Sequence, residues 1–270
     1  MYEILFLLLA GIGAGVVTGL IGGSAVLISV PIMIIFLEYD IFTAIGLSLG
    51  IDVIASIMAA AIYRKHKNLD FRIGIHMSAI AIIGVIIGTA FSFYIPKALL
   101  TGATGFGICF SGVNFLTKKI KEETKEIVED LHLHYKSKKY WATMFFALIV
   151  GFIGGSFGAG GGLSILLILT FILGFRIHKA IGTSIFIMIF VALSGAISHF
   201  IYQPFPIWII FVAGIGAIFG SKYSAKIANV LTEKQLNKLA GILFVALGIA
   251  LIIKQLYDSG YWIYLIGSLI

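Results

Sequence analysis

The chain has 270 residues, of which 60% are hydrophobic and 11% charged, and its mean hydropathy is +1.10. A soluble domain needs charged residues on every surface helix, and here apolar blocks of about 20 residues or more lack them, which excludes a large soluble fold. The formal net charge of +7 is spread over short clusters between these blocks, so it predicts membrane orientation and argues against a nucleic-acid partner.

The chain begins with an apolar run that holds Glu3 and has no basic segment before it. A cleaved signal peptide has a basic segment at this place, so we expect the first run to be a membrane element. Further apolar blocks follow along the chain, and short polar segments separate them. The blocks run over 4–37, 42–63, 73–95, 98–117, 142–174, 180–202, 207–220 and 239–253.

The first and fifth blocks are too long for a single crossing. Each has about 33 residues, and an unbroken helix of that length would measure about 50 Å against a hydrocarbon core of about 30 Å. Glycine clusters lie near the middle of both blocks, "GLIGGSA" at 19–25 and "GGSFGAGGGLS" at 154–164. Because glycine is the worst helix former after proline, we predict that each block is a hairpin of two short helices.

The fourth and fifth blocks are separated by the only long charged stretch, 118–141. Its apolar residues fall near helical spacing, which predicts a surface amphipathic helix that connects two halves. The domains are then a membrane repeat over 1–117, the connector over 118–141, a second membrane repeat over 142–256 and an interfacial tail over 257–270.

The two halves are related in sequence. "TAIGLS" at 43–48 returns as "KAIGTS" at 179–184, an offset of 136 residues, and Gly15, Gly19 and Gly22 recur at the same offset. If each broken block returns to its starting side, 17 of the 19 Lys and Arg residues fall on one face. The positive-inside rule then places the N-terminus outside and the connector in the cytoplasm.

This topology predicts the fold class. Each half has an odd number of crossings after its hairpin, so the halves run in opposite directions through the membrane. We therefore expect an all-α integral membrane protein of two inverted repeats, each a glycine-broken helical hairpin followed by three transmembrane helices. Inverted repeats with matching broken elements are typical of secondary transporters, whose substrate binds near the midplane.

The glycine clusters themselves are the first candidate site. The second helix of each hairpin would begin just after its cluster, where free backbone N–H groups and the helix dipole favour an anion. Glycine also lets a bulky oxyanion approach the backbone. The predicted substrate-binding residues are Gly22, Gly23 and Ser24 in the first half and Gly160, Gly161 and Gly162 in the second. For the regular GxxxG pairs we expect close helix packing instead.

The duplicated motif supplies a layer of hydroxyl groups. Ser48, Thr183 and Ser184 are candidates to donate hydrogen bonds to the anion from opposite sides. The alternative is that these hydroxyls bond a neighbouring helix or their own carbonyls, as most do in membranes.

Asp52 is the only acid well inside an apolar block, and Met188 stands at its equivalent position. An ionisable group at that depth is a functional hypothesis, and reversible protonation would couple anion movement to protons. The alternative is an aspartate that only bonds another helix. His76 and His199 fall toward block ends, where we expect interfacial or structural roles.

Chemistry of other kinds is not indicated. No His, Cys or carboxylate cluster has the spacing of a metal site, and no nucleophile and base pair is evident, so we expect neither an enzyme nor a metal or other cofactor. Nucleotide binding lacks its motif as well.

With these features the chain resembles the TauE/SafE sulfite exporters, also called the toluene sulfonate uptake permease family. The resemblance rests on the glycine-rich break of each half, the duplicated "AIG[LT]S" and the basic turn "YRKHKNLDFR" after the second block. The first half departs from the family pattern, with Ser24, Ala25 and Val26 where more glycine is usual. The resemblance implies a carrier of sulfur-containing anions such as sulfite or sulfonates in the inner membrane.

The function expected from the sequence is thus secondary transport of a small sulfur-containing anion across the cytoplasmic membrane, with proton coupling as an added hypothesis. The alternative is an anion channel in which the hairpin tips form the selectivity constriction. The expected partners are the anion and the lipid bilayer, and a homodimer is left open.

Overall fold

The computed structural model describes residues 2–117, 138–158, 161–175, 177–228 and 233–258, and within them it contains helices and no strands. In chain order the helices are α1 (Tyr2–Ile21), α2 (Val26–Phe36), α3 (Ile41–Lys65), α4 (Phe71–Ser92), α5 (Lys97–Thr117), α6 (Lys138–Phe157), α7 (Gly161–Phe171), α8 (Ile177–Tyr202), α9 (Trp208–Ile227) and α10 (Glu233–Asp258). Six of them are long and apolar enough to cross a membrane: α1, α3, α4, α6, α8 and α9. The predicted all-α membrane fold is confirmed.

Most residues of two predicted segments, the connector and the C-terminal tail, lie outside the residues that the structure describes. Residues 118–137 of the predicted connector and 259–270 of the predicted tail lie outside the described residues. The remaining residues of each belong to helices, because α6 begins at Lys138 and α10 ends at Asp258.

Both predicted breaks are confirmed, and each falls at a glycine in the left-handed region. α1 ends before Gly22, which has φ +65°, and α6 ends before Gly158, which has φ +68°. Residues with a Cβ rarely adopt such angles, so the glycine fixes where the helix stops. The N–H of Gly22 then closes the last turn of α1 on the carbonyl of Thr18 at 3.0 Å.

The arms of each hairpin are unequal, which differs from the predicted pair of short helices. The first arms α1 and α6 have 20 residues each, or about 30 Å, while α2 and α7 have 11 residues each, or about 16 Å. The helices continue through the first glycines of each cluster because those glycines pack against other helices. Gly19 lies against α9 and Gly155 against α4, where a Cβ would meet backbone atoms.

Glycine faces hold the long helices together in two matching pairs. α1 packs along α9 and α6 packs along α4, and in both pairs a Cβ added at the spaced glycines would clash with the opposite backbone. The packing role expected for these glycines is confirmed. The residues concerned are Gly11, Gly15, Gly19, Gly216 and Gly220 in the first pair, and Gly84, Gly88, Gly151 and Gly155 in the second.

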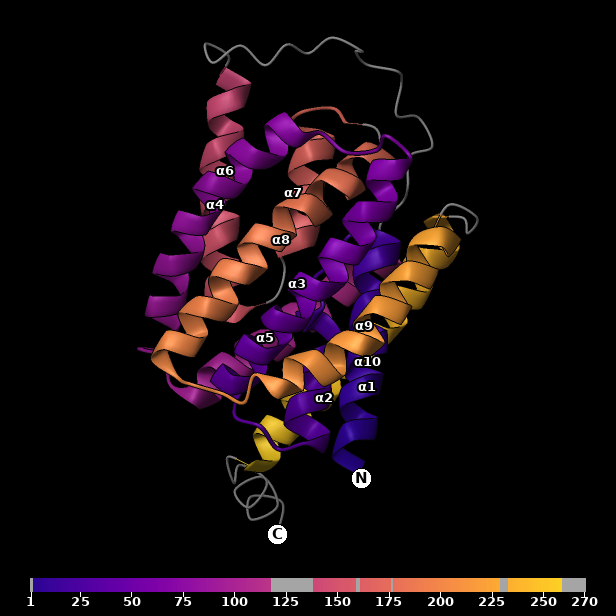
Figure 1. Ribbon diagram of the computed structural model, residues 1–270. Coiled ribbons are helices and arrows are strands. Elements are labelled where there is room, and N and C mark those ends of the chain that lie inside the picture. Colours follow the sequence, from indigo (N-terminus) through magenta and orange to yellow (C-terminus); the bar gives the residue numbers. More distant parts are fainter. Residues whose placement is uncertain (1, 118–137, 159–160, 176, 229–232, 259–270) are drawn as a thin grey trace.

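The helix pairs follow the sequence repeat. The first helix of each half packs on the fourth helix of the other half, α3 packs against α8, and α5 packs against α10. In Figure 1, α1 begins at the lower end of the bundle and α6 begins at the upper end, so the first arms of the two hairpins enter from opposite ends.

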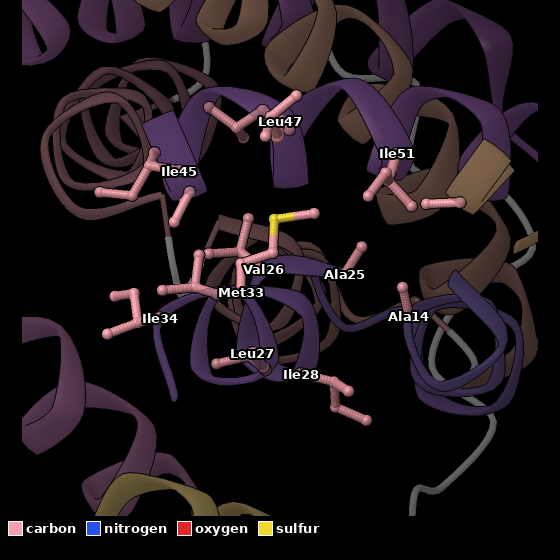
Figure 2. Packing of buried hydrophobic residues seen from close by; sticks show 14 of the residues in the cluster. Ala14, Ala25, Val26, Leu27, Ile28, Met33, Ile34, Ile45, Leu47 and Ile51 are labelled. Atoms are coloured by element: carbon pink, nitrogen blue, oxygen red, sulfur yellow. The ribbon is translucent and has the colours of Figure 1, made fainter. Parts of the chain in front are cut away.

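The short helix α2 is surrounded by protein. Its side chains are apolar on every face, which is the pattern of a helix buried on all sides. Figure 2 shows Val26 and Met33 pointing toward Ile45 and Leu47 of α3, while Leu27 and Ile28 point the opposite way. All of these α2 side chains are buried. The hairpin tip at the start of α2 therefore lies in the protein interior.

Candidate functional site

The two hairpin tips touch each other in the interior. A Cβ added at Gly162, in the first turn of α7, would clash with the carbonyl oxygen of Gly22 at the end of α1. Each tip also rests on the repeated motif of the other half. A Cβ at Gly22 would lie 2.9 Å from Oγ of Ser184 on α8, and one at Gly158 would lie 2.7 Å from a methyl group of Ile45 on α3.

The first tip holds the carboxylate of Asp52. This side chain is fully buried on α3 and accepts three hydroxyl hydrogen bonds. Ser24 Oγ donates to Oδ2 at 2.7 Å, while Thr18 Oγ1 and Ser56 Oγ donate to Oδ1 at 3.3 Å each. The backbone N–H of Ala25, just before α2, is a further donor.

Asp52 therefore occupies the position that an anion would take at the N-terminus of α2. Among the ion pairs of the described residues, none involves this carboxylate. Its environment consists of hydroxyl and amide groups in the protein interior, where donors are needed because an unsatisfied carboxylate would be very costly.

The second tip lacks every member of this cluster. At the offset of 136 residues, the positions of Thr18, Ser24, Asp52 and Ser56 are taken by Gly154, Gly160, Met188 and Ala192. The structure places the Met188 sulfur 3.3 Å from where a Cβ of Gly161 would lie. Gly160 lies outside the described residues. Within the part of the chain that is described, no side chain accepts a hydrogen bond from the backbone N–H groups of Gly161 or Gly162.

The predicted hydroxyl layer is only partly at the tips. Ser184 lies against Gly22 and donates to the carbonyl of Ile181 at 2.9 Å. Ser48 donates to the sulfur of Met33 at 3.7 Å, on the side facing α2. Thr183 accepts the backbone N–H of Asp70 at 3.0 Å, at the turn between α3 and α4. The structure thus brings Ser184 to the first tip and directs Ser48 and Thr183 elsewhere.

A further pair of residues supports the broken helix ends. A helix that stops leaves its last carbonyls without partners. Tyr63 on α3 donates to the carbonyl of Gly19 at 3.3 Å, and Nε2 of His199 on α8 lies 3.1 Å from the carbonyl of Gly155. Both the side chains and the glycines are related by the offset of 136 residues.

These two residues correct and extend the sequence interpretation. His199 was expected toward an interface in an interfacial or structural role. Its exposed fraction is 1%, because α3, α6 and Phe93, the residue after α4, cover it. Tyr63 was not singled out. The shared offset was the signal that would have found both.

The hydroxyl partners of Asp52 were also missed apart from Ser24. The signal was present in the departures from the repeat, since four positions of the first half are polar where the second half has Gly, Gly, Met and Ala. The hydroxyl of Ser24, which the second half replaces by Gly160, holds the carboxylate of Asp52.

Polar side chains close the ends of the crossing between α3 and α8. At one end, Asp40 caps α3. Its carboxylate accepts hydrogen bonds from Nε2 of Gln203 at 2.8 Å and from Oγ1 of Thr43 at 2.6 Å. At the other, Lys179 lies 3.0 Å from the carboxylate of Asp70, which caps α4. A cavity of about 470 Å³ opens beside Asp40. Its lining includes Tyr39, Lys97, Thr101 and Lys254.

Long apolar helices, with two broken hairpins whose tips meet in the interior, define a multi-pass α-helical membrane protein. Comparison with known sequences assigns its family. The chain belongs to the sulfite exporter TauE/SafE family, whose model matches residues 7–251. The chain is accordingly a membrane transporter and not an enzyme.

Several curated relatives match over most of their length. The probable membrane transporter protein YunE of Bacillus subtilis (strain 168) is 27% identical over 93% of this chain and 98% of its own. YdhB of the same organism is 24% identical over 81% of this chain and 88% of its own length. MJ0441 of Methanocaldococcus jannaschii is 24% identical over 93% of this chain and 98% of its own length. No solved structure matches the chain significantly.

Proposed function

We propose that this protein is a secondary transporter that carries a small sulfur-containing anion, such as sulfite or a sulfonate, across the cytoplasmic membrane. The observation that carries the proposal is the second tip. There the N-terminus of α7 lies buried against Gly22, and Gly161 and Gly162 offer backbone N–H groups without an acceptor among the described side chains. Such a helix start favours an oxyanion, and the family is named for sulfite export.

The proposed transport cycle uses two inverted repeats. The matching pairs α1–α9 and α6–α4, and the opposite entry of the two hairpins in Figure 1, support this arrangement. With the N-terminus outside, the Asp40 end faces outward and the Asp70 end faces the cytoplasm. The polar bonds at the two ends then break alternately to admit and release the anion.

Asp52 is the proposed coupling residue. Its three hydroxyl partners can each turn to donate or accept, so the cluster tolerates both the carboxylate and the carboxylic acid. Loss of the negative charge would lower the repulsion felt by an anion at the neighbouring tip. Proton uptake and anion binding would then favour each other.

The direct test is uptake into proteoliposomes that contain the purified protein. Sulfite, a small sulfonate, sulfate, thiosulfate, acetate and chloride are offered separately, with and without an inward proton gradient. We expect saturable uptake of one sulfur anion that the gradient stimulates. A non-saturating chloride current would instead favour a channel, with the contact of Gly22 and Gly162 as its constriction, and no flux of any sulfur anion would overturn the proposal.

The topology has a separate test. In a Cys109→Ala background, a cysteine at Ile177, the first residue of α8, is treated with a membrane-impermeant thiol reagent in intact cells and in inverted vesicles. We expect labelling only in the inverted vesicles. Labelling in intact cells would contradict the proposed topology, because it would place the start of α8 outside.

A further inference from the structure

Tyr63 and His199 perform one structural task in the two halves. Each donates a hydrogen bond from the third helix of its half to a carbonyl near the end of the broken helix, Gly19 for Tyr63 and Gly155 for His199. Thr89 of α4 adds a second donor to the carbonyl of Gly155, at 3.3 Å. A phenol with one polar atom is sufficient for the task at the first tip.

The imidazole of His199 carries a second nitrogen that this task does not use. A carbonyl oxygen only accepts, so Nε2 must carry the hydrogen, and in the neutral ring Nδ1 is a bare acceptor. Nδ1 is buried and has no hydrogen-bond partner among the described residues. Buried polar atoms are almost always satisfied, and an exception requires an explanation.

Several helices surround the ring, and none brings a charge to it within the described residues. α3 places Gly46 against its Cβ, α6 contributes Gly155, and Phe93 after α4 lies 5.6 Å away between ring centroids. One turn further along α8, Gln203 donates its backbone N–H to the carbonyl of His199 at 2.8 Å and its side chain to Asp40 at 2.8 Å.

His199 therefore lies between the second tip and the end of the bundle that holds the cavity beside Asp40. Met188, which faces Gly161 at the tip, precedes it on α8 by three turns, or about 16 Å of helix. Because the effective dielectric constant of a protein interior is lower than that of water, charges interact over such distances more strongly than in water.

We propose that His199 is a second proton-exchanging residue of this transporter and serves the second tip. Nδ1 takes up a proton from water at the Asp40 end while Nε2–H stays on the carbonyl of Gly155. The resulting imidazolium makes no ion pair with a carboxylate among the described residues, so an anion bound at the tip adds a favourable charge interaction, and proton and anion stabilise each other. Release of the anion returns the proton to water. The inference rests on the proposed function, because it requires an anion at the second tip.

Two variants separate proton exchange from the structural task. His199→Gln keeps a donor for the carbonyl of Gly155, and His199→Tyr copies Tyr63 of the other half; neither titrates near neutral pH. Tyr63→Phe is the matched control, since it removes the equivalent hydrogen bond and no group that titrates near neutral pH.

The first measurement is the rate of sulfur-anion uptake as external pH is varied from about 5.5 to 8. If a protonated imidazole is required, the wild-type rate falls by about tenfold per pH unit above its pKa. Because Asp52 is also proposed to exchange protons, we expect Tyr63→Phe to keep the wild-type slope and both His199 variants to show a shallower one. An unchanged slope in His199→Gln would overturn the inference while leaving the proposed function intact. No uptake by the wild type at any pH would instead remove the proposed function.

The second measurement is proton uptake on anion binding, which can be made even on variants that bind the anion without transporting it. Calorimetric titration with the same anion, in two buffers of different ionisation enthalpy, gives the protons taken up per anion bound. We expect His199→Gln and His199→Tyr to take up fewer protons than the wild type, and an equal number would overturn the inference. Failure of both variants to fold would overturn it as well, because the imidazole would then be structural.

Discussion

Both hairpin tips break at a glycine with positive φ, Gly22 and Gly158, yet among the described residues only the first tip holds a carboxylate. Asp52 and its hydroxyl partners fill the start of α2, while Met188 faces the start of α7. The backbone of an anion site is thus present twice, and the protein's own side chain occupies one copy. This comparison supports the proposal that an external anion binds at the second tip.

The largest expected effect is a loss of stability on substitution at the first tip, which the equivalent substitution at the second tip should not cause. Asp52→Leu leaves Thr18, Ser24, Ser56 and the N–H of Ala25 without their acceptor, and we expect it to lower the free energy of unfolding by roughly 4 kcal/mol or more, at about 1–3 kcal/mol per buried group. Met188→Leu at the equivalent position should cost less than about 1.5 kcal/mol. Thermal unfolding in detergent measures both, and similar losses would contradict the difference between the tips.

The contact between the tips is expected to give the next largest effect. Gly162→Ala drives a methyl group into the carbonyl of Gly22, and overpacking of this kind costs roughly 1–3 kcal/mol. We expect it to abolish anion uptake. Gly161→Ala should be milder, because the flexible thioether of Met188 can move away.

Gly154→Ala is the matched control from the same glycine cluster. A Cβ there meets nothing within 4 Å, and the residue is helical, so the variant should be neutral or more stable by up to about 1 kcal/mol. If Gly162→Ala and Gly154→Ala transport equally well, the tips do not form the site.

Placing the carboxylate of the first tip at the equivalent position of the second tip should weaken anion binding without a large change in the backbone. Met188→Asp places a carboxylate near Gly161, and repulsion of roughly 1–2 kcal/mol would lower the affinity for an anion about tenfold. Met188→Asn is the uncharged control and should bind as the wild type does. Binding of sulfite or a sulfonate by calorimetry is the measurement, and equal affinity in the two variants would place the anion elsewhere.

The smallest effect concerns the base of the first hairpin. Tyr39 donates to Glu3 at 3.0 Å and joins the end of the hairpin to the start of α1, whereas Phe175 stands at its equivalent position. This exposed bond should contribute less than about 1 kcal/mol, which Tyr39→Phe would remove.

The pH dependence of this bond has a definite sign. Burial and the neighbouring carboxylate of Glu3 raise the pKa of Tyr39 to about 12, above its unfolded value of about 10. The contribution is therefore fully present below pH about 10 and is lost as pH rises through about 12. The stability difference between wild type and Tyr39→Phe should stay constant from pH 5 to 9, and a difference that changes within this range would contradict the assignment.

The sequence allowed the breaks and the helix pairs to be predicted, because block length and glycine spacing act locally. It did not locate each break within its cluster. Gly19 and Gly22 read alike in sequence, but Gly19 packs on α9 and stays helical while Gly22 turns. That distinction depends on a helix from the other half of the chain.

The candidate site was predictable as a set of residue types and not as an arrangement. Gly22, Gly162 and Asp52 were identified from composition and motif, but the contact between the tips joins residues from different halves. The hydrogen bond from Thr18 to Asp52 joins residues 34 positions apart. Such contacts depend on how whole helices cross, and the local spacing of residues in the sequence does not predict the crossing.

The pairing of α1 with α9 has a consequence for synthesis. α1 leaves the ribosome long before its partner α9. At about 5–20 residues per second, the glycine face of α1 waits roughly 10–40 s before α9 can cover it. During that interval this face lies against lipid or the insertion machinery, so the growing chain depends on its surroundings to hold α1 in place until α9 has been made.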